Sequence, residues 1–111
     1  MAFLQRVVNG GGFVDREYGI GRGAIDLLVR WPLPDGTWQR EGLELKVWPD
    51  KKPDPLAAGL TQLDGYLTRL GLPRGALVIF DRRTQREPID TRVRVDATTS
   101  PDGREVWVLR A

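Results

Sequence analysis

The chain has 111 residues, enough for one hydrophobic core, so we expect a single domain over residues 1–111. Its apolar share of 41% and charged share of 29% are ordinary for a globular protein. Cysteine and histidine are both absent, which excludes disulfides, thiol catalysis, zinc clusters and a histidine general base. Oxygen atoms are the ligands that remain, and they favour Mg²⁺ or Mn²⁺ as the metal.

The net charge is +2, from 17 Lys and Arg against 15 Asp and Glu, which permits a nucleic-acid partner without requiring one. No apolar run approaches the roughly 20 residues of a membrane-spanning helix, so we expect no membrane partner. The N-terminus lacks the basic and apolar regions of a signal peptide. A cytoplasmic location is therefore the expectation.

The first half of the chain predicts one short helix and three strands, in the order helix 3–8, strand 13–20, strand 24–29 and strand 40–48. Glycines end the helix, and a glycine-rich turn at 21–23 joins the first two strands. Strands connected by so short a turn pair antiparallel. A loop with Asp35-Gly36 separates the second strand from the third.

The second half predicts a helix, a strand and a hairpin. Asp54 is expected as the N-cap and Pro55 as the first residue of a helix that ends before Gly71. Leucines at helical spacing form its apolar stripe, at Leu56, Leu60, Leu63, Leu67 and Leu70. An apolar strand over 75–81 follows, and a strand reached through a helix favours a crossover with parallel pairing. Residues 91–95 and 105–109 read as a hairpin.

Three charged residues stand inside two of the apolar strands. Asp26 interrupts the second strand, and Glu44-Leu45-Lys46 lies in the third. Because strand side chains alternate, Glu44 and Lys46 share one face. Pairing of these strands would bring two carboxylates and an ammonium together, as a divalent-metal site for phosphodiester hydrolysis requires. Two alternatives are structural: a buried Asp26–Lys46 salt bridge, or a Glu44 that faces solvent on an edge strand.

The element order and these residues resemble the PD-(D/E)XK nuclease superfamily. Asp26 and Glu44-Leu45-Lys46 match its half-motif, with Ile25 where the family often has proline. Gln62 and Tyr66 match the Gln-x-x-x-Tyr motif of RecB-like members. Longer segments are similar to the small nuclease-like domain at the C-terminus of bacterial AAA-type ATP-binding proteins, namely residues 9–12, 16–23, 59–62 and 80–83.

The resemblance implies a restriction-endonuclease-like α/β fold, with a three-layer α/β/α core around a mixed central sheet. It also implies that Asp26, Glu44 and the backbone carbonyl of Leu45 bind Mg²⁺ or Mn²⁺. Lys46 would position the attacking water or stabilise the pentacoordinate phosphorus.

Three further residues receive roles from the resemblance. Gln62 and Tyr66 would orient a ligand or bind the nucleic-acid backbone, although such residues taken alone are more often surface and core-rim positions. Relatives supply another acid from their first helix, where residues 1–9 contain none. Glu17 substitutes for it if its side chain faces Asp26.

The expected function is a metal-dependent nuclease, with DNA as the expected substrate. The alternative is a non-catalytic nucleic-acid-binding or coupling module of an AAA-type ATPase, which would be its partner. A homodimer whose two sites cut two strands is a third, weaker alternative.

Overall fold

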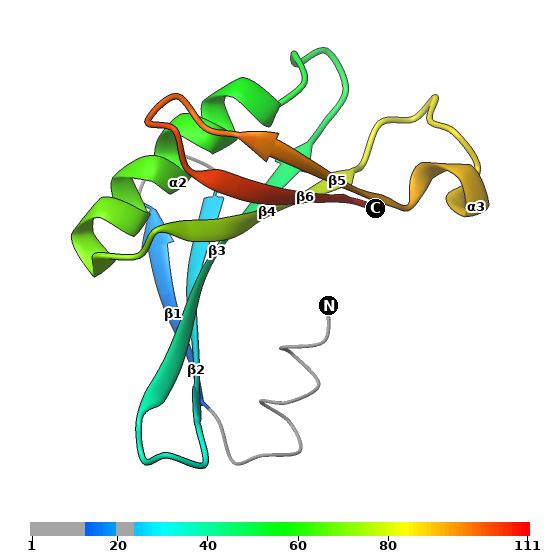
Figure 1. The fold of residues 1–111 in the computed structure, drawn as a ribbon. Helices are drawn as coiled ribbons and strands as arrows, with labels where there is room; N and C mark the ends of the chain where they lie inside the picture. The colour runs from blue at the N-terminus through cyan, green and yellow to red at the C-terminus, as the bar shows by residue number, and fades with distance from the viewer. Residues whose placement is uncertain (1–12, 20–23) are drawn as a thin grey trace.

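The computed structural model describes residues 13–19 and 24–111, with the side chains of residues 14–19, 24 and 25 outside this description. The predicted helix over 3–8 and the turn at 21–23 therefore lie outside the described residues. The described part folds as a mixed sheet with helices (Figure 1). Its elements are β1 (Phe13–Gly19), β2 (Ala24–Pro32), β3 (Trp38–Trp48), α2 (Leu56–Leu70), β4 (Arg74–Asp81), α3 (Ile89–Arg92), β5 (Arg94–Thr99) and β6 (Glu105–Arg110).

The sheet has the strand order β1-β2-β3-β4-β6-β5. β1, β2 and β3 form an antiparallel meander, whereas β4 is parallel to β3 and is reached through α2. β6 is parallel to β4, and β5 pairs antiparallel with β6 at the edge. The predicted α/β class, meander and parallel crossover are confirmed. The restriction-endonuclease-like three-layer arrangement stays a prediction.

Strand β2 continues to Pro32 and β3 begins at Trp38, beyond the predicted 24–29 and 40–48, and two further predicted boundaries are wrong. The first strand of the hairpin, predicted over 91–95, begins at Arg94, because residues 89–92 form α3. The backbone carbonyl of Pro88 accepts the N–H groups of Thr91 and Arg92 at 3.1 and 2.8 Å, which closes this helical turn. Helix α2 begins at Leu56 rather than Pro55, which is the N-cap. Asp54 precedes the cap, and its carboxylate accepts the Leu56 N–H at 3.0 Å.

Helix α2 buries its leucine stripe against β3, β4 and β6. The core on this side is formed by Leu60, Leu63, Tyr66, Leu67, Leu77, Ile79, Val106 and Val108. Two glycines opposite each other on β3 and β4, Gly42 and Gly75, let Leu67 approach the sheet closely. A Cβ on Gly75 would lie 2.9 Å from a Leu67 methyl and 2.8 Å from the Gly42 carbonyl oxygen. The helix therefore lies directly on the sheet backbone at this point.

The opposite face of the sheet has a second apolar cluster. It consists of Val29, Trp31, Leu43, Ala76 and Val78. The alternation of strand side chains divides β3 between the two faces, with Leu43 in this cluster and Glu44 toward α2. Within residues 13–19 and 24–111, no helix has both the length and the apolar character needed to span a membrane.

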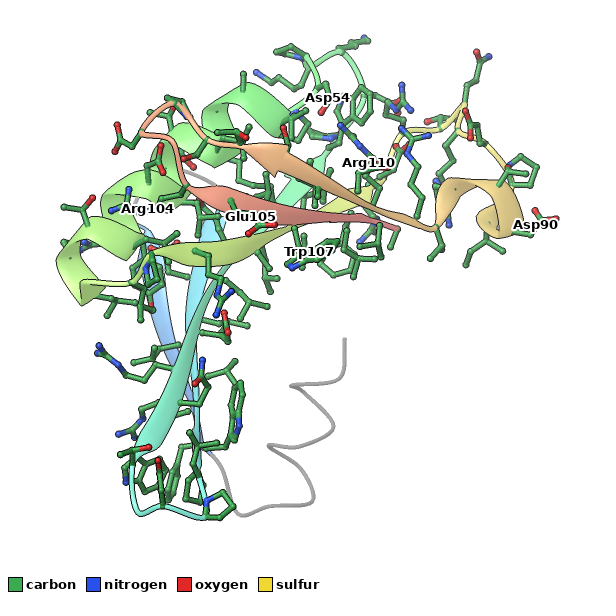
Figure 2. All side chains as sticks on the ribbon, in the orientation of Figure 1. Asp54, Asp90, Arg104, Glu105, Trp107 and Arg110 are labelled. Carbon is green, nitrogen blue, oxygen red and sulfur yellow. The ribbon has the colours of Figure 1, made fainter. Side chains whose placement is uncertain are left out.

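Arg104 anchors the β5–β6 hairpin to the C-terminal half of α2 (Figure 2). Its guanidinium donates to the Leu72 carbonyl at 3.1 Å, to the Thr68 hydroxyl at 2.9 Å and to the Asp64 carboxylate at 3.2 Å. Asp64 also accepts the backbone N–H of Asp102 at 2.9 Å. Burial alone would raise the pKa of Asp64, but hydrogen bonds from Ser100, Asp102 and Arg104 outweigh it and lower the pKa. Asp64 is thus a structural buried acid.

A pair of glycine substitutions tests the close approach of α2. Gly75→Ala should lower the free energy of unfolding by about 1–3 kcal/mol, because its Cβ meets backbone and Leu67. Gly65→Ala should raise it by about 0.5–1 kcal/mol, because Gly65 is exposed within α2 with nothing within 4 Å of an added Cβ. Urea unfolding measures both, and equal effects of the two changes would contradict this packing.

Candidate functional site

Asp26 and Glu44 face each other across β2 and β3. They are partners in the antiparallel register, and Lys46 lies two residues beyond Glu44 on β3. Both strands direct these side chains toward α2, since the register places Glu44 beside Leu77 of the α2-facing core. The exposed fractions are 3% for Asp26, 0% for Glu44 and 7% for Lys46. All three predicted site residues are therefore buried together on one face.

The alternative in which Glu44 faces solvent on an edge strand is wrong. β3 is an internal strand, with β2 on one side and β4 on the other. Glu44 occupies the α2-facing side, where the leucines of α2 and the side chain of Leu77 exclude water. A buried carboxylate beside a second carboxylate costs several kcal/mol unless a cation compensates it. This pair of acids thus creates a strong local demand for positive charge.

Helix α2 supplies polar groups above these acids. The Lys46 ammonium donates a hydrogen bond to the Gln62 side-chain oxygen at 3.0 Å. Gln62, Tyr66 and Arg69 follow one another at spacings of four and three, so they form a stripe beside the leucines. The structure therefore brings Gln62 to Lys46.

Tyr66 is 2% exposed, and its ring belongs to the core beneath α2. The Arg69 guanidinium lies 5.5 Å from the centre of that ring and 3.8 Å from an Asp26 carboxylate oxygen. The Arg69 side chain is 61% exposed, so solvent screening weakens this ion pair. Sequence reasoning missed Arg69, although its position seven residues after Gln62 places it on the same helix stripe.

The other predicted site residues are placed by their strands. Glu17 is the register partner of Asp26 on β1, and its side chain lies outside the described residues. Leu45 lies between Glu44 and Lys46, with its side chain half-buried on the face opposite α2. Among the residues with described side chains, no group of three acidic residues is arranged to hold a metal ion. The candidate metal ligands among the predicted site residues with described side chains are therefore two carboxylates, Asp26 and Glu44.

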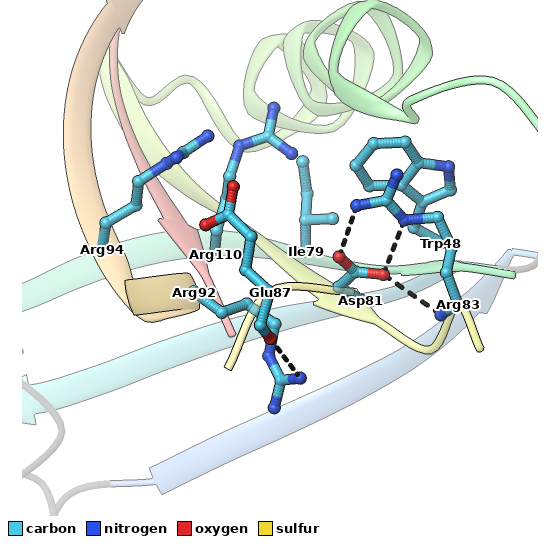
Figure 3. Close-up of a pocket in the computed structure, with 8 residues that line it drawn as sticks. All are labelled: Trp48, Ile79, Asp81, Arg83, Glu87, Arg92, Arg94 and Arg110. Atoms are coloured by element: carbon cyan, nitrogen blue, oxygen red, sulfur yellow. Dashed lines mark hydrogen bonds and ion pairs between the residues drawn. The ribbon is translucent and has the colours of Figure 1, made fainter. Parts of the chain in front are cut away.

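A second polar group lies on the same face of the sheet. A hollow of about 50 Å³ opens beside the ends of β3, β4 and β6 (Figure 3). Its lining comes from β3, β4, the loop after β4, α3, β5 and β6, and contains Trp48, Ile79, Asp81, Arg83, Glu87, Arg92, Arg94 and Arg110. The four arginines are spread over 28 positions and show no regular spacing in the sequence. They become neighbours only through the pairing of β4 with β6, which the sequence does not specify.

Two arginines of the hollow are held by acids. Arg83 donates to both carboxylate oxygens of Asp81, at 2.9 and 2.7 Å, and its guanidinium carbon lies 3.5 Å from the centre of a Trp48 ring. These hydrogen bonds lower the pKa of Asp81 to about 2. Arg110 donates to the Asp54 carboxylate at 2.9 and 3.3 Å.

No family model matches the sequence, and searches of curated proteins and of solved structures found no match either.

The buried charges predict a coupling between Lys46 and Glu44. Lys46→Met should lower the free energy of unfolding by about 3 kcal/mol in metal-free buffer, because it leaves two buried carboxylates without this ammonium. Glu44→Gln added to Lys46→Met should recover a large part of that loss. Urea unfolding of both single variants and the double variant measures the coupling, and simply additive effects would contradict it.

The Asp81–Arg83 pair predicts a specific pH dependence. The pKa of Asp81 is below its unfolded value of about 3.9, so the pair stabilises the fold above that pH and loses its contribution as pH falls toward 2. Asp81→Asn should cost about 1 kcal/mol at pH 7, after allowing for solvent screening. The difference between wild type and variant, measured by urea unfolding from pH 7 to pH 3, should shrink below pH 4. A difference that does not change with pH would contradict the pairing.

Proposed function

We propose that this chain is a metal-dependent phosphodiesterase that acts on nucleic acid, with DNA as the substrate. The observation that carries the proposal is the buried register pair of Asp26 and Glu44 with Lys46 on the same face. Like charges directly opposite each other on adjacent strands destabilise a sheet. A divalent cation between the two carboxylates would convert this repulsion into binding energy.

The donor set fits Mg²⁺ or Mn²⁺. Both ions prefer oxygen ligands, and Mg²⁺ is commonly held by one or two carboxylates while waters and substrate phosphates complete the octahedron. Asp26 and Glu44 would supply the carboxylates. The Leu45 carbonyl belongs to an internal strand, where one of its lone pairs accepts a hydrogen bond of the sheet. Its second lone pair would bind the metal. Glu17, opposite Asp26 in the register, is the position from which a third acid would come.

The bound metal would lower the pKa of a coordinated water and neutralise charge on the scissile phosphate. Lys46 would hold the attacking water or the phosphate oxygen, with its ammonium oriented by Gln62. Tyr66 and Arg69 would form the helix side of the same site, where Arg69 lies at the solvent boundary. No histidine general base is needed, because metal coordination would lower the pKa of the attacking water enough for it to lose its proton to solvent.

A second candidate function is favoured by the burial of the acids. Glu44 is 0% exposed and Asp26 is 3% exposed, so a phosphate reaches them only if the surrounding structure opens. A non-catalytic nucleic-acid-binding or coupling module of an AAA-type ATPase would keep such a site closed. Metal binding without cleavage would favour this second candidate.

The test separates metal binding from cleavage. Mn²⁺ at a hundred times its dissociation constant should stabilise the wild type by about 2.7 kcal/mol, measured as a thermal shift against EDTA. Glu44→Gln should abolish both the shift and Mn²⁺-dependent cleavage of DNA. Lys46→Ala should keep most of the shift and lose cleavage at least a hundredfold.

Gly65→Ala is the matched control, because Gly65 is an exposed position of α2 where an added Cβ meets nothing within 4 Å. It should behave as the wild type in both measurements. A wild type that folds but shows neither a shift nor cleavage would overturn the proposal. Cleavage at the wild-type rate by Lys46→Ala would remove Lys46 from the mechanism.

A further inference from the structure

We propose that the arginine-lined hollow binds a phosphate group of the polynucleotide substrate. The hollow itself stands on its own geometry, whereas its assignment to a polynucleotide rests on the proposed function. Arg83 from the loop after β4, Arg92 from α3, Arg94 from β5 and Arg110 from β6 converge there (Figure 3). Clustered cations repel one another, so an anion between them would stabilise this arrangement.

The four arginines differ in how much of their hydrogen-bonding capacity the protein uses. Arg83 and Arg110 are engaged by Asp81 and Asp54, as described above. Arg92 is different, because its Nε is buried and has no hydrogen-bond partner within residues 13–19 and 24–111. The only hydrogen bond that the Arg92 side chain makes to the described chain is a long one of 3.4 Å to the Glu87 carbonyl.

Arg94 is also weakly engaged. Its side chain is 54% exposed, and its contact with Asp96 is 3.7 Å long, with Asp96 63% exposed. Such exposed pairs contribute little and are easily exchanged for a stronger partner. Arg92 and Arg94 therefore have N–H groups that a ligand could use. Arg83 and Arg110 are held in place by their ion pairs and line the hollow beside them.

The shape and chemistry of the hollow favour a phosphate group. Guanidinium groups bind phosphate oxygens through paired, charge-assisted hydrogen bonds. A volume of about 50 Å³ accommodates a few waters or one small tetrahedral anion, and it is well below the ~300 Å³ of typical sites for larger ligands. Glu87 also lines the hollow, and its negative charge opposes the anion.

The position of the hollow connects it to the candidate metal site. Lys46 is the register partner of Ile79, Ile79 of Arg110, and Arg110 of Arg94, so these residues form one row across β3, β4, β6 and β5. At about 4.8 Å per strand, Arg110 lies roughly 10 Å from Lys46 along this row. A strand with its scissile phosphate at Asp26 and Glu44 would thus present another of its phosphates to the arginines.

The first measurement is calorimetric titration of inorganic phosphate into the full chain in EDTA, so that the metal site takes no part. Arg94→Gln and Arg92→Gln should each weaken phosphate binding about tenfold. Glu87→Gln should strengthen it severalfold, because a like charge is removed. Arg82→Gln is the matched control, since Arg82 is exposed and does not line the hollow. Circular dichroism confirms that each variant is folded.

The second measurement is binding of a single-stranded oligonucleotide in EDTA at several salt concentrations. Loss of one phosphate contact should reduce the slope of log affinity against log salt by about 0.7 in Arg94→Gln. The proposal is supported if Arg94→Gln both weakens phosphate binding and reduces the salt dependence of oligonucleotide affinity. No phosphate binding by the wild type overturns it. Phosphate binding with an unchanged oligonucleotide slope overturns the polynucleotide assignment and identifies a site for free phosphate.

These outcomes are independent of catalysis. The oligonucleotide and phosphate are both measured without metal, so neither result depends on cleavage. A chain that binds strands through the arginines but never cleaves them would contradict the proposed nuclease and leave this site standing.

Discussion

The contact between α2 and the two strands β3 and β4 determines which side of the sheet becomes enclosed. It depends on Gly42 and Gly75, which lie side by side and leave room for Leu67 against the backbone. With the helix this close, Gln62 reaches Lys46, and the Tyr66 ring enters the core. The same approach removes Glu44 from water. Packing and the chemistry of the charged residues are therefore consequences of one contact.

The two faces of strand β3 carry different kinds of side chain. Leu43 contributes to the core away from α2, while Glu44 and Lys46 share the enclosed side with leucines. A hydrophobic replacement at these two positions would give a simpler core of the same shape. The sequence instead places charge where burial is most expensive, which is the pattern expected of positions under a functional constraint.

Much of this arrangement could be predicted from local patterns. Alternation around Asp26 and Glu44, the leucine spacing of α2 and the apolar run of β4 each identify an element from neighbouring residues alone. The burial of Glu44 followed from its apolar neighbours. Local patterns failed at Pro88, where a carbonyl that accepts two N–H groups turns residues 89–92 into a helix before β5.

The arginine hollow could not be predicted for a different reason. Its residues are neighbours only because β6 enters the sheet next to β4 and parallel to it, and no local signal specifies that choice of partner. Arg69 is the intermediate case, since its helix spacing was visible but its approach to Asp26 depends on how α2 lies across the sheet.

The strand order also has a consequence for the sequence of events in folding. The meander of β1, β2 and β3 needs only short connections, so the register of Asp26 with Glu44 is available early. The parallel pair of β4 and β6 closes much later, because it waits for the residues through Arg110. During synthesis on the ribosome, the acidic pair can thus exist before the arginines have any common location. On the enclosed face of this sheet, the pair of acids can form first and the cluster of arginines forms last.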